Sequence, residues 1–151
     1  MRSIKYRAFY KGEMRQVTAL EWIHEDEDLA GCYLTGIDKC VIVNDDETTF
    51  GVDLLEFTGL TDRNGVEIYE GDIIKFTYST GYSTPIVTGV VEFGEYCAGS
   101  NDYGDLISLG FYVAQTRLNS HEWNLFDDEI RKGKVIGNIY ESPELLEKGE
   151  S

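Results

Sequence analysis

Residues 57–76 read FTGLTDRNGVEIYEGDIIKF and contain the clearest structural signals in the chain. Asn64-Gly65 is a strong signal for a tight turn, because both residues tolerate a positive φ. Residues 70–72, Glu-Gly-Asp, predict a second turn, in which the glycine supplies backbone freedom and the aspartate bonds nearby amides. An alternating strand follows at residues 74–78. This part of the chain is therefore predicted to form tight turns that lead into strands.

Strand patterns continue on both sides of this stretch. Apolar and basic residues alternate from Ile4 to Tyr10, which is the period of a strand with one buried face. Further strands are predicted at residues 41–43, 50–57, 86–93, 111–114, 121–126 and 135–140. We expect the first two of these to form a hairpin, and residues 74–78 to pair with residues 86–93.

Two short helices and one loop complete the prediction. Thr18 and Glu21 have the spacing of a capping box, so we predict a helix over residues 19–28. Residues 142–144, Ser-Pro-Glu, place a cap, a proline and an acid in the order that starts a helix. Residues 94–110 contain four glycines together with Asn and Asp, and are predicted to form a flexible loop.

Short strands at regular intervals with few helices indicate the fold class. We predict a mainly β (β-rich α+β) protein, a small antiparallel barrel or pseudo-barrel with one or two short helices. The length of 151 residues suits a single domain, 1–151. Composition also allows an N-terminal subdomain, 1–57, and a C-terminal β-barrel part, 58–141.

The charge of the chain is strongly negative, with 28 acidic and 13 basic side chains and a net charge of −15. Such a field repels phosphate backbones, so we expect no direct nucleic acid binding. A basic face is expected to start only at residues 1–15, which hold five basic side chains and one acidic one. The acidic clusters at residues 25–28, 45–47 and 127–129 are either solvated loops or a face for a basic partner.

The chain has no sequence signal for a membrane. Its longest stretch without a charged residue, 76–91, is rich in Thr, Ser and Gly, whereas a membrane helix needs about 20 mostly apolar residues. No apolar run follows the basic residues at the start, so no signal peptide is predicted. We therefore expect a cytoplasmic protein.

Cysteine spacing gives no local metal motif. Cys32, Cys40 and Cys97 are an odd number without a paired Cys-x-x-Cys element, and are predicted to be buried free thiols. The alternative is a zinc site that combines them with His24 or His121.

Other candidate sites have simpler explanations. The glycines of residues 94–110 lack the Gly-Lys-Ser/Thr ending of a phosphate loop, and nearby carboxylates would repel phosphate. Asn101, Asp102 and Asp105 do not have the register of a calcium loop. The pairs His24-Glu25 and His121-Glu122 have no nucleophile context. We therefore predict no catalytic, metal or cofactor-binding residue, no cofactor and no enzymatic activity.

Aromatic residues are abundant, with ten Tyr, seven Phe and two Trp. Trp22, Trp123 and the tyrosines would line a ligand groove or belong to the core and to an interface. Because aromatic residues are enriched where subunits meet, we expect an interface.

Three segments resemble the YopX-like proteins of bacteriophages and prophages. Residues 4–9 read IKYRAF, residues 57–72 contain Thr-Gly-Leu, Asp-x-Asn-Gly and Ile-Tyr-Glu-Gly-Asp, and residues 135–146 read VIGNIYESPELL. Together they span nearly the whole chain. The resemblance implies a small phage-encoded accessory protein that self-associates, with no activity or ligand to assign to any position.

The expected function is interaction with other proteins, as a homo-oligomer and with a host or phage protein. The alternative is an acidic nucleic-acid mimic, in which rows of carboxylates occupy the basic site of a host DNA-binding protein. A surface on which the carboxylates form one ordered row would favour the mimic.

Overall fold

The computed structural model describes residues 5–22, 30–43, 52–79, 81–114, 122–124, 130 and 132–147. The strands are β1 (Tyr6–Tyr10), β2 (Glu13–Trp22), β3 (Ala30–Leu34), β4 (Cys40–Ile42), β5 (Leu54–Thr61), β6 (Glu67–Tyr69), β7 (Asp72–Thr77), β8 (Ile86–Asn101), β9 (Gly104–Ala114), β10 (Glu122–Asn124) and β11 (Lys134–Asn138). The helix α2 spans Glu144–Glu147 and begins directly after the predicted Ser-Pro signal. The predicted β-rich fold class is confirmed.

The chain divides into two compact units, Met1–Phe57 and Thr58–Ser151. Strands β1 to β6 form an antiparallel sheet with the order β4-β3-β2-β1-β5-β6, and the unit boundary falls within β5. The core of the first unit consists of Ala8, Cys32, Leu34 and Val52. Ala8 is fully buried at the centre of β1, which pairs with β2 and β5 on its two edges, and its side chain packs within this cluster.

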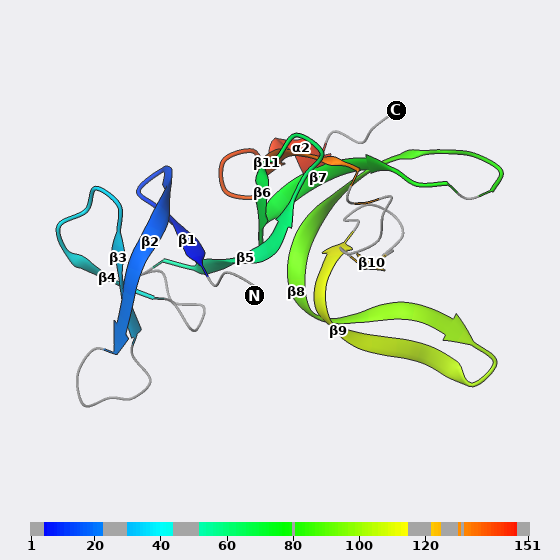
Figure 1. Ribbon diagram of the computed structural model, residues 1–151, viewed down its shortest axis with the longest axis horizontal. Coiled ribbons are helices and arrows are strands. Elements are labelled where there is room, and N and C mark those ends of the chain that lie inside the picture. The colour runs from blue at the N-terminus through cyan, green and yellow to red at the C-terminus, as the bar shows by residue number, and fades with distance from the viewer. Residues whose placement is uncertain are drawn as a thin grey trace. The chain divides into compact units, whose positions relative to one another are not determined.

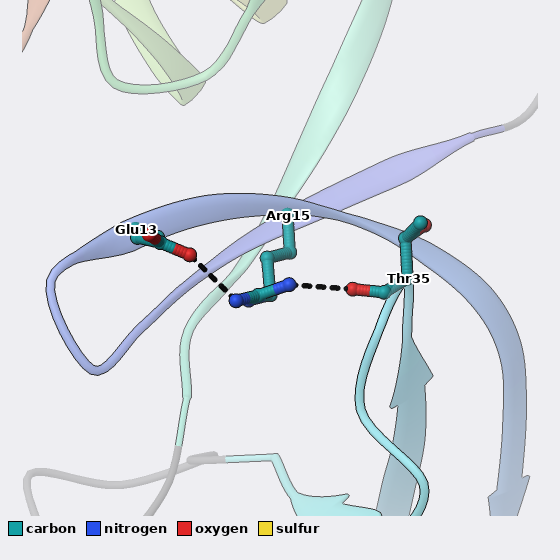
Figure 2. A network of polar contacts seen from close by, with 3 residues as sticks. All are labelled: Glu13, Arg15 and Thr35. Atoms are coloured by element: carbon teal, nitrogen blue, oxygen red, sulfur yellow. Dashed lines mark hydrogen bonds and ion pairs between the residues drawn. The ribbon is translucent and has the colours of Figure 1, made fainter.

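Arg15 ties β2 to the end of β3 in the first unit (Figure 2). Its guanidinium donates to the Thr35 carbonyl at 2.8 Å and to the Glu13 carboxylate at 2.5 Å. The Glu13 side chain is 65% exposed, and an ion pair at such a surface contributes little to stability. The contact therefore orients this end of β3 and neutralises one of the basic side chains near the start of the chain.

The second unit is built on a five-stranded sheet with the order β10-β9-β8-β7-β11. Branched and aromatic side chains on one side of these strands form its core together with Ile68 of β6 and with Ile130. The buried members are Ile68, Ile74, Phe76, Val87, Val91, Phe111, Val113 and Ile130. The predicted pairing of residues 74–78 with residues 86–93 is confirmed by the register of β7 and β8, from Ile73 opposite Val90 to Thr77 opposite Ile86.

The two predicted turns are confirmed. Gly65 has a φ of +81° and its amide donates to the Asp62 carbonyl at 3.0 Å, which closes the turn between β5 and β6. Gly71 has a φ of +82°, in the region that favours glycine. The buried Asp72 carboxylate accepts the amide of Tyr69 at 2.8 Å. Local sequence therefore decided both turns.

The helix predicted over residues 19–28 is wrong where the structure describes it, because β2 continues to Trp22. Leu20 lies opposite Cys32 in the register of β2 and β3. The Thr18 hydroxyl donates to the Tyr33 carbonyl at 3.2 Å, and the Tyr33 hydroxyl donates to the Glu21 carboxylate at 3.0 Å. Both polar groups of the expected capping box are thus used across the strand pair. Residues 23–29 lie outside the described residues.

Two other expectations are corrected. The hairpin of residues 41–43 with 50–57 is wrong, because β4 pairs with β3 and β5 pairs with β1. The loop predicted at residues 94–110 is instead the paired ends of β8 and β9 around a short turn. The basis of both errors is pairing between segments, which local composition does not encode. Neither sheet closes into a barrel within the described residues, so the sheets agree with the pseudo-barrel form of the predicted fold.

We expect Gly71→Val to destabilise the protein more than Gly99→Val. Gly71 is buried, and its backbone bonds both Val91 and Ile139. A β-branched residue at its φ costs about 1–3 kcal/mol. Gly99 also has a positive φ, +155°, which strains a side chain, but it is only half-buried, and a Cβ there meets only the end of the Leu106 side chain, at 4.0 Å. Thermal melts of both variants measure the difference, and equal shifts would contradict it.

Candidate functional site

The outer half of the β8–β9 hairpin, residues 93–111, projects beyond the rest of its sheet, and we call it the arm (Figure 1). Strand β7 pairs with β8 only between Ile86 and Val90. Strand β10 pairs with β9 only between Tyr112 and Ala114. Within the described part of the chain, the arm is therefore a two-stranded ribbon without a third strand on either edge.

One face of the arm carries a row of exposed apolar side chains that starts at the core. In an antiparallel pair, residues directly opposite each other share a face. Phe111, which is buried, lies opposite Phe93, and the two rings meet edge to face at 5.0 Å. Farther out on the same face lie Leu109, opposite the exposed Glu95, and Ile107, opposite Cys97. Phe93, Leu109 and Ile107 are 49%, 69% and 62% exposed, and we call these three residues the apolar row.

The other face of the arm is held by aromatic and polar contacts. Tyr96 stacks on Tyr112 with ring centroids 5.3 Å apart, although the two residues are not direct partners in the register. The Tyr112 hydroxyl donates to the Glu92 carboxylate at 2.8 Å. These contacts cross from β8 to β9 at the base of the arm. They give the ribbon a defined direction where it leaves the sheet.

The arm buries little of its own apolar surface. A two-stranded hairpin alone is at best marginally stable in water, because it buries little apolar area. Here the three most exposed members of a core-facing stripe remain in contact with water. Contiguous exposed apolar side chains of this kind mark surfaces that bind other molecules. The arm is therefore the candidate functional site.

The sequence-predicted glycine segment lies in this arm but forms no phosphate cradle. Its pairing is continuous apart from an irregularity between Cys97 and Gly99. At the tip, the Asn101 side chain accepts the amide of Tyr103 at 2.8 Å, which is an ordinary turn contact. Across the described residues, no group of three His, Cys, Asp or Glu side chains is placed to hold a metal ion.

The three cysteines are free and differ in exposure. Cys32 is buried, Cys40 is half-buried and Cys97 is exposed. Burial, and then the nearby Cys40, raise the pKa of the Cys32 thiol. The prediction of buried thiols is therefore right for Cys32 and wrong for Cys97, which lies on the apolar face of the arm opposite Ile107.

Several other candidates fall outside what the structure describes. They include both histidines and the acidic clusters at residues 25–28, 45–47 and 127–129. The backbones of Trp22 and Trp123 lie in β2 and β10. The structure therefore offers no observation that favours the nucleic-acid mimic. Within the described chain, no helix has the length and apolar character needed to cross a membrane.

A group of basic residues from separate segments also lies in the second unit. There Arg63, Lys75, Lys132 and Lys134 line one cavity. Near the start of the chain, in contrast, Arg15 is paired with Glu13, and the ammonium of Lys5 lies 4.4 Å from the centre of the Phe57 ring. Sequence analysis missed the cavity because its cations come from separate segments.

Two antiparallel sheets, tight glycine turns and a hairpin arm with exposed apolar side chains define a β-rich protein. The model of the YopX protein family matches residues 5–147, and the chain belongs to this family. The family resemblance predicted from the three sequence segments is thereby confirmed.

One solved structure that is similar to the chain is the crystal structure of protein EF1440 from Enterococcus faecalis. Its sequence identity is 25%, the match covers 97% of this chain and 99% of that chain, and the TM-score is 0.48. A search of the curated proteins found no match to this chain.

Proposed function

We propose that this protein is a phage- or prophage-encoded accessory protein of the bacterial cytoplasm that acts through protein–protein contacts, and that it forms a homo-oligomer through its arm. The apolar row supports this proposal. It extends the core face of the sheet into solvent along a ribbon that has no third strand within the described residues.

A second copy of the chain is the proposed occupant of the arm. Two arms that pack face to face across a two-fold axis place the same row on both sides, so the surface is complementary to itself. The acidic residues of the tip, Asp102 and Asp105, then lie at opposite ends of an antiparallel contact. Repulsion between two chains of net charge −15 persists, but the Debye length of about 8 Å at physiological salt screens most of it.

We expect Leu109→Glu to convert the oligomer to a monomer. Leu109 is 69% exposed in the single chain, so the substitution should cost little folding stability. It places a second carboxylate directly opposite Glu95 in the centre of the proposed contact, where burial of two like charges without a cationic partner is unfavourable. Size-exclusion chromatography with light scattering measures the mass, and wild type is expected at a multiple of the subunit mass. Its assembly should weaken as salt is removed, because screening is lost.

Val66→Glu is the matched control, since Val66 is 48% exposed and lies at the β5–β6 turn, away from the arm. It should leave the wild-type mass unchanged. A wild-type monomer at every concentration and salt level would refute self-association. An oligomer that survives Leu109→Glu would place the interface elsewhere, and one that dissociates as salt is added would indicate an interface held by ion pairs.

A further inference from the structure

A carboxylate lies in the middle of the apolar row. Glu95 is directly opposite Leu109 in the register of β8 and β9, so the two side chains share a face. Its neighbours on this face along β8 are Phe93 and Cys97, because alternate residues of a strand point to the same side. Glu95 is exposed in the single chain. A molecule that covers the apolar row therefore covers this carboxylate too.

The arm offers no cation to this carboxylate. Residues 93–111 contain no Lys, Arg or His. The β9 residues that face Glu95 directly or diagonally are Leu109, Ile107 and Phe111, none of which titrates. The other titratable groups on this face, within the described arm, are the Cys97 thiol and the Asp105 carboxylate nearer the tip. In the single chain, water solvates the charge of Glu95.

An arm–arm contact changes the surroundings of Glu95. The second arm has the same sequence, so it also brings no cation. A carboxylate that is buried without a cationic partner is unfavourable, whereas the protonated form is neutral and can donate a hydrogen bond. The contact also holds two such groups, and two negative charges repel each other. Association of two arms is therefore coupled to the uptake of protons.

We propose that protonation of Glu95 controls self-association through the arm, so that assembly tightens as the pH falls from about 7.5 to about 5.5. This inference rests on the proposed function, because it concerns the same surface. The sign follows from linkage: the assembled state binds more protons than the separate chains, so lower pH favours assembly. Each proton gained on assembly changes the dissociation constant by about tenfold per pH unit.

The effect of Glu95 is separable from a general loss of charge. Exposed carboxyl groups have ordinary pKa values of about 3.9–4.3, so most of them stay ionised at about pH 5.5. The two histidines of the chain, with an ordinary pKa of about 6.5, gain charge in this range and reduce the repulsion between subunits. That contribution is common to wild type and to variants at other positions, so a comparison between variants removes it.

Glu92 provides the matched control, on the opposite face of the same strand. It lies opposite Tyr112, whose hydroxyl donates to its carboxylate at 2.8 Å. Glu92→Gln keeps an oxygen that accepts this bond and removes one negative charge, as Glu95→Gln does. The two variants thus have the same net charge and differ in the face of the arm that they change.

Analytical ultracentrifugation of the full chain at about pH 7.5 and about pH 5.5, at constant ionic strength, measures the dissociation constant. Wild type should assemble about tenfold or more tightly at the lower pH. Glu95→Gln should assemble about tenfold more tightly than wild type at the higher pH, and should lose most of the pH dependence. Glu92→Gln should keep the pH dependence of wild type.

The outcomes separate this inference from the proposed function. An oligomer that Leu109→Glu dissociates, but whose pH dependence is the same in Glu95→Gln as in wild type, would overturn the inference and leave the arm contact in place. Equal effects of Glu92→Gln and Glu95→Gln would also overturn it, because they would indicate a general effect of charge. Wild type and Glu95→Gln that both remain monomers at both pH values would refute the arm contact itself, and the inference with it.

Discussion

Replacing Asp62 with alanine is expected to lower the free energy of unfolding by about 3–5 kcal/mol. The carboxylate is 6% exposed and accepts three backbone amides, those of Asn64 at 2.8 Å, Val66 at 2.9 Å and Val135 at 2.9 Å. Alanine leaves these donors without an acceptor, and each buried donor left unpaired costs about 1–3 kcal/mol. The Val135 bond joins the β5–β6 turn to β11, so the loss also separates two parts of the second unit. Denaturant unfolding measures the change.

Asp62→Asn tests the hydrogen bonds more specifically than Asp62→Ala, because it keeps the size of the side chain. Oδ1 accepts the amides of Asn64 and Val66, whereas Oδ2 accepts that of Val135. An asparagine can keep the first two bonds but turns an NH2 group toward the Val135 amide. We therefore expect an intermediate loss of stability. Asp105→Ala, at an exposed position in β9, is the control and should change stability by less than about 0.5 kcal/mol.

The same carboxylate should make the protein sensitive to acid. Burial raises the pKa of Asp62, but the hydrogen bonds from Val135, Val66 and Asn64 outweigh it, so the pKa in the folded state lies below its ordinary value. A lowered pKa contributes stability above the unfolded value of about 3.9, and this contribution is lost as pH falls through the folded pKa. Wild type should therefore lose more stability than Asp62→Asn between about pH 5 and pH 3. Parallel pH curves for the two proteins would contradict this role.

The second large effect is expected for Gly89→Ala, at about 1–3 kcal/mol of lost stability. A Cβ on Gly89 would lie 2.5 Å from the Val113 side chain and 2.9 Å from the Ala114 carbonyl. Val113 is fully buried and β-branched, so neither it nor the backbone can move away easily. The strand must shift to admit one methyl group, which is the usual cost of overpacking a core. Thermal and denaturant melts measure it.

Gly110→Ala is the matched control in the same hairpin. A Cβ there has no heavy atom within 4 Å, and the residue has no strained φ. Since glycine in a strand costs about 0.5–1 kcal/mol relative to alanine, this variant should be neutral or slightly stabilising. The two alanine substitutions are thus expected to have opposite signs. Equal destabilisation would show that the close approach at Gly89 is relieved without cost.

The arm shows where a composition argument fails. The glycines and Asn/Asp residues of 94–110 are typical of loops, yet Phe93 through Asn101 pair with Gly104 through Phe111. Branched and aromatic side chains within the same stretch are typical of strands. The prediction of a loop gave more weight to the glycines. What the sequence could not indicate is that Leu109 and Ile107, 69% and 62% exposed, continue the core face of the sheet beyond the part that other segments cover.

The cation cavity was beyond sequence analysis for a related reason. Lys75 and Lys134 lie far apart in the chain and meet only because β11 pairs with β7. Each basic residue taken singly looks like an ordinary surface charge in an acidic protein. No local window contains the three segments that Gly133 brings together.

By itself, the sequence determined the β-rich class, the family and the turns at Gly65 and Gly71. These features depend on short-range chemistry, namely the period of two in a strand and the freedom of glycine at positive φ. Tertiary structure alone decided which strands pair, and so converted the capping pattern of Thr18 and Glu21 into cross-strand contacts with Tyr33. The physical reason is that a strand obtains its hydrogen bonds from another segment, whereas a turn closes on its own residues.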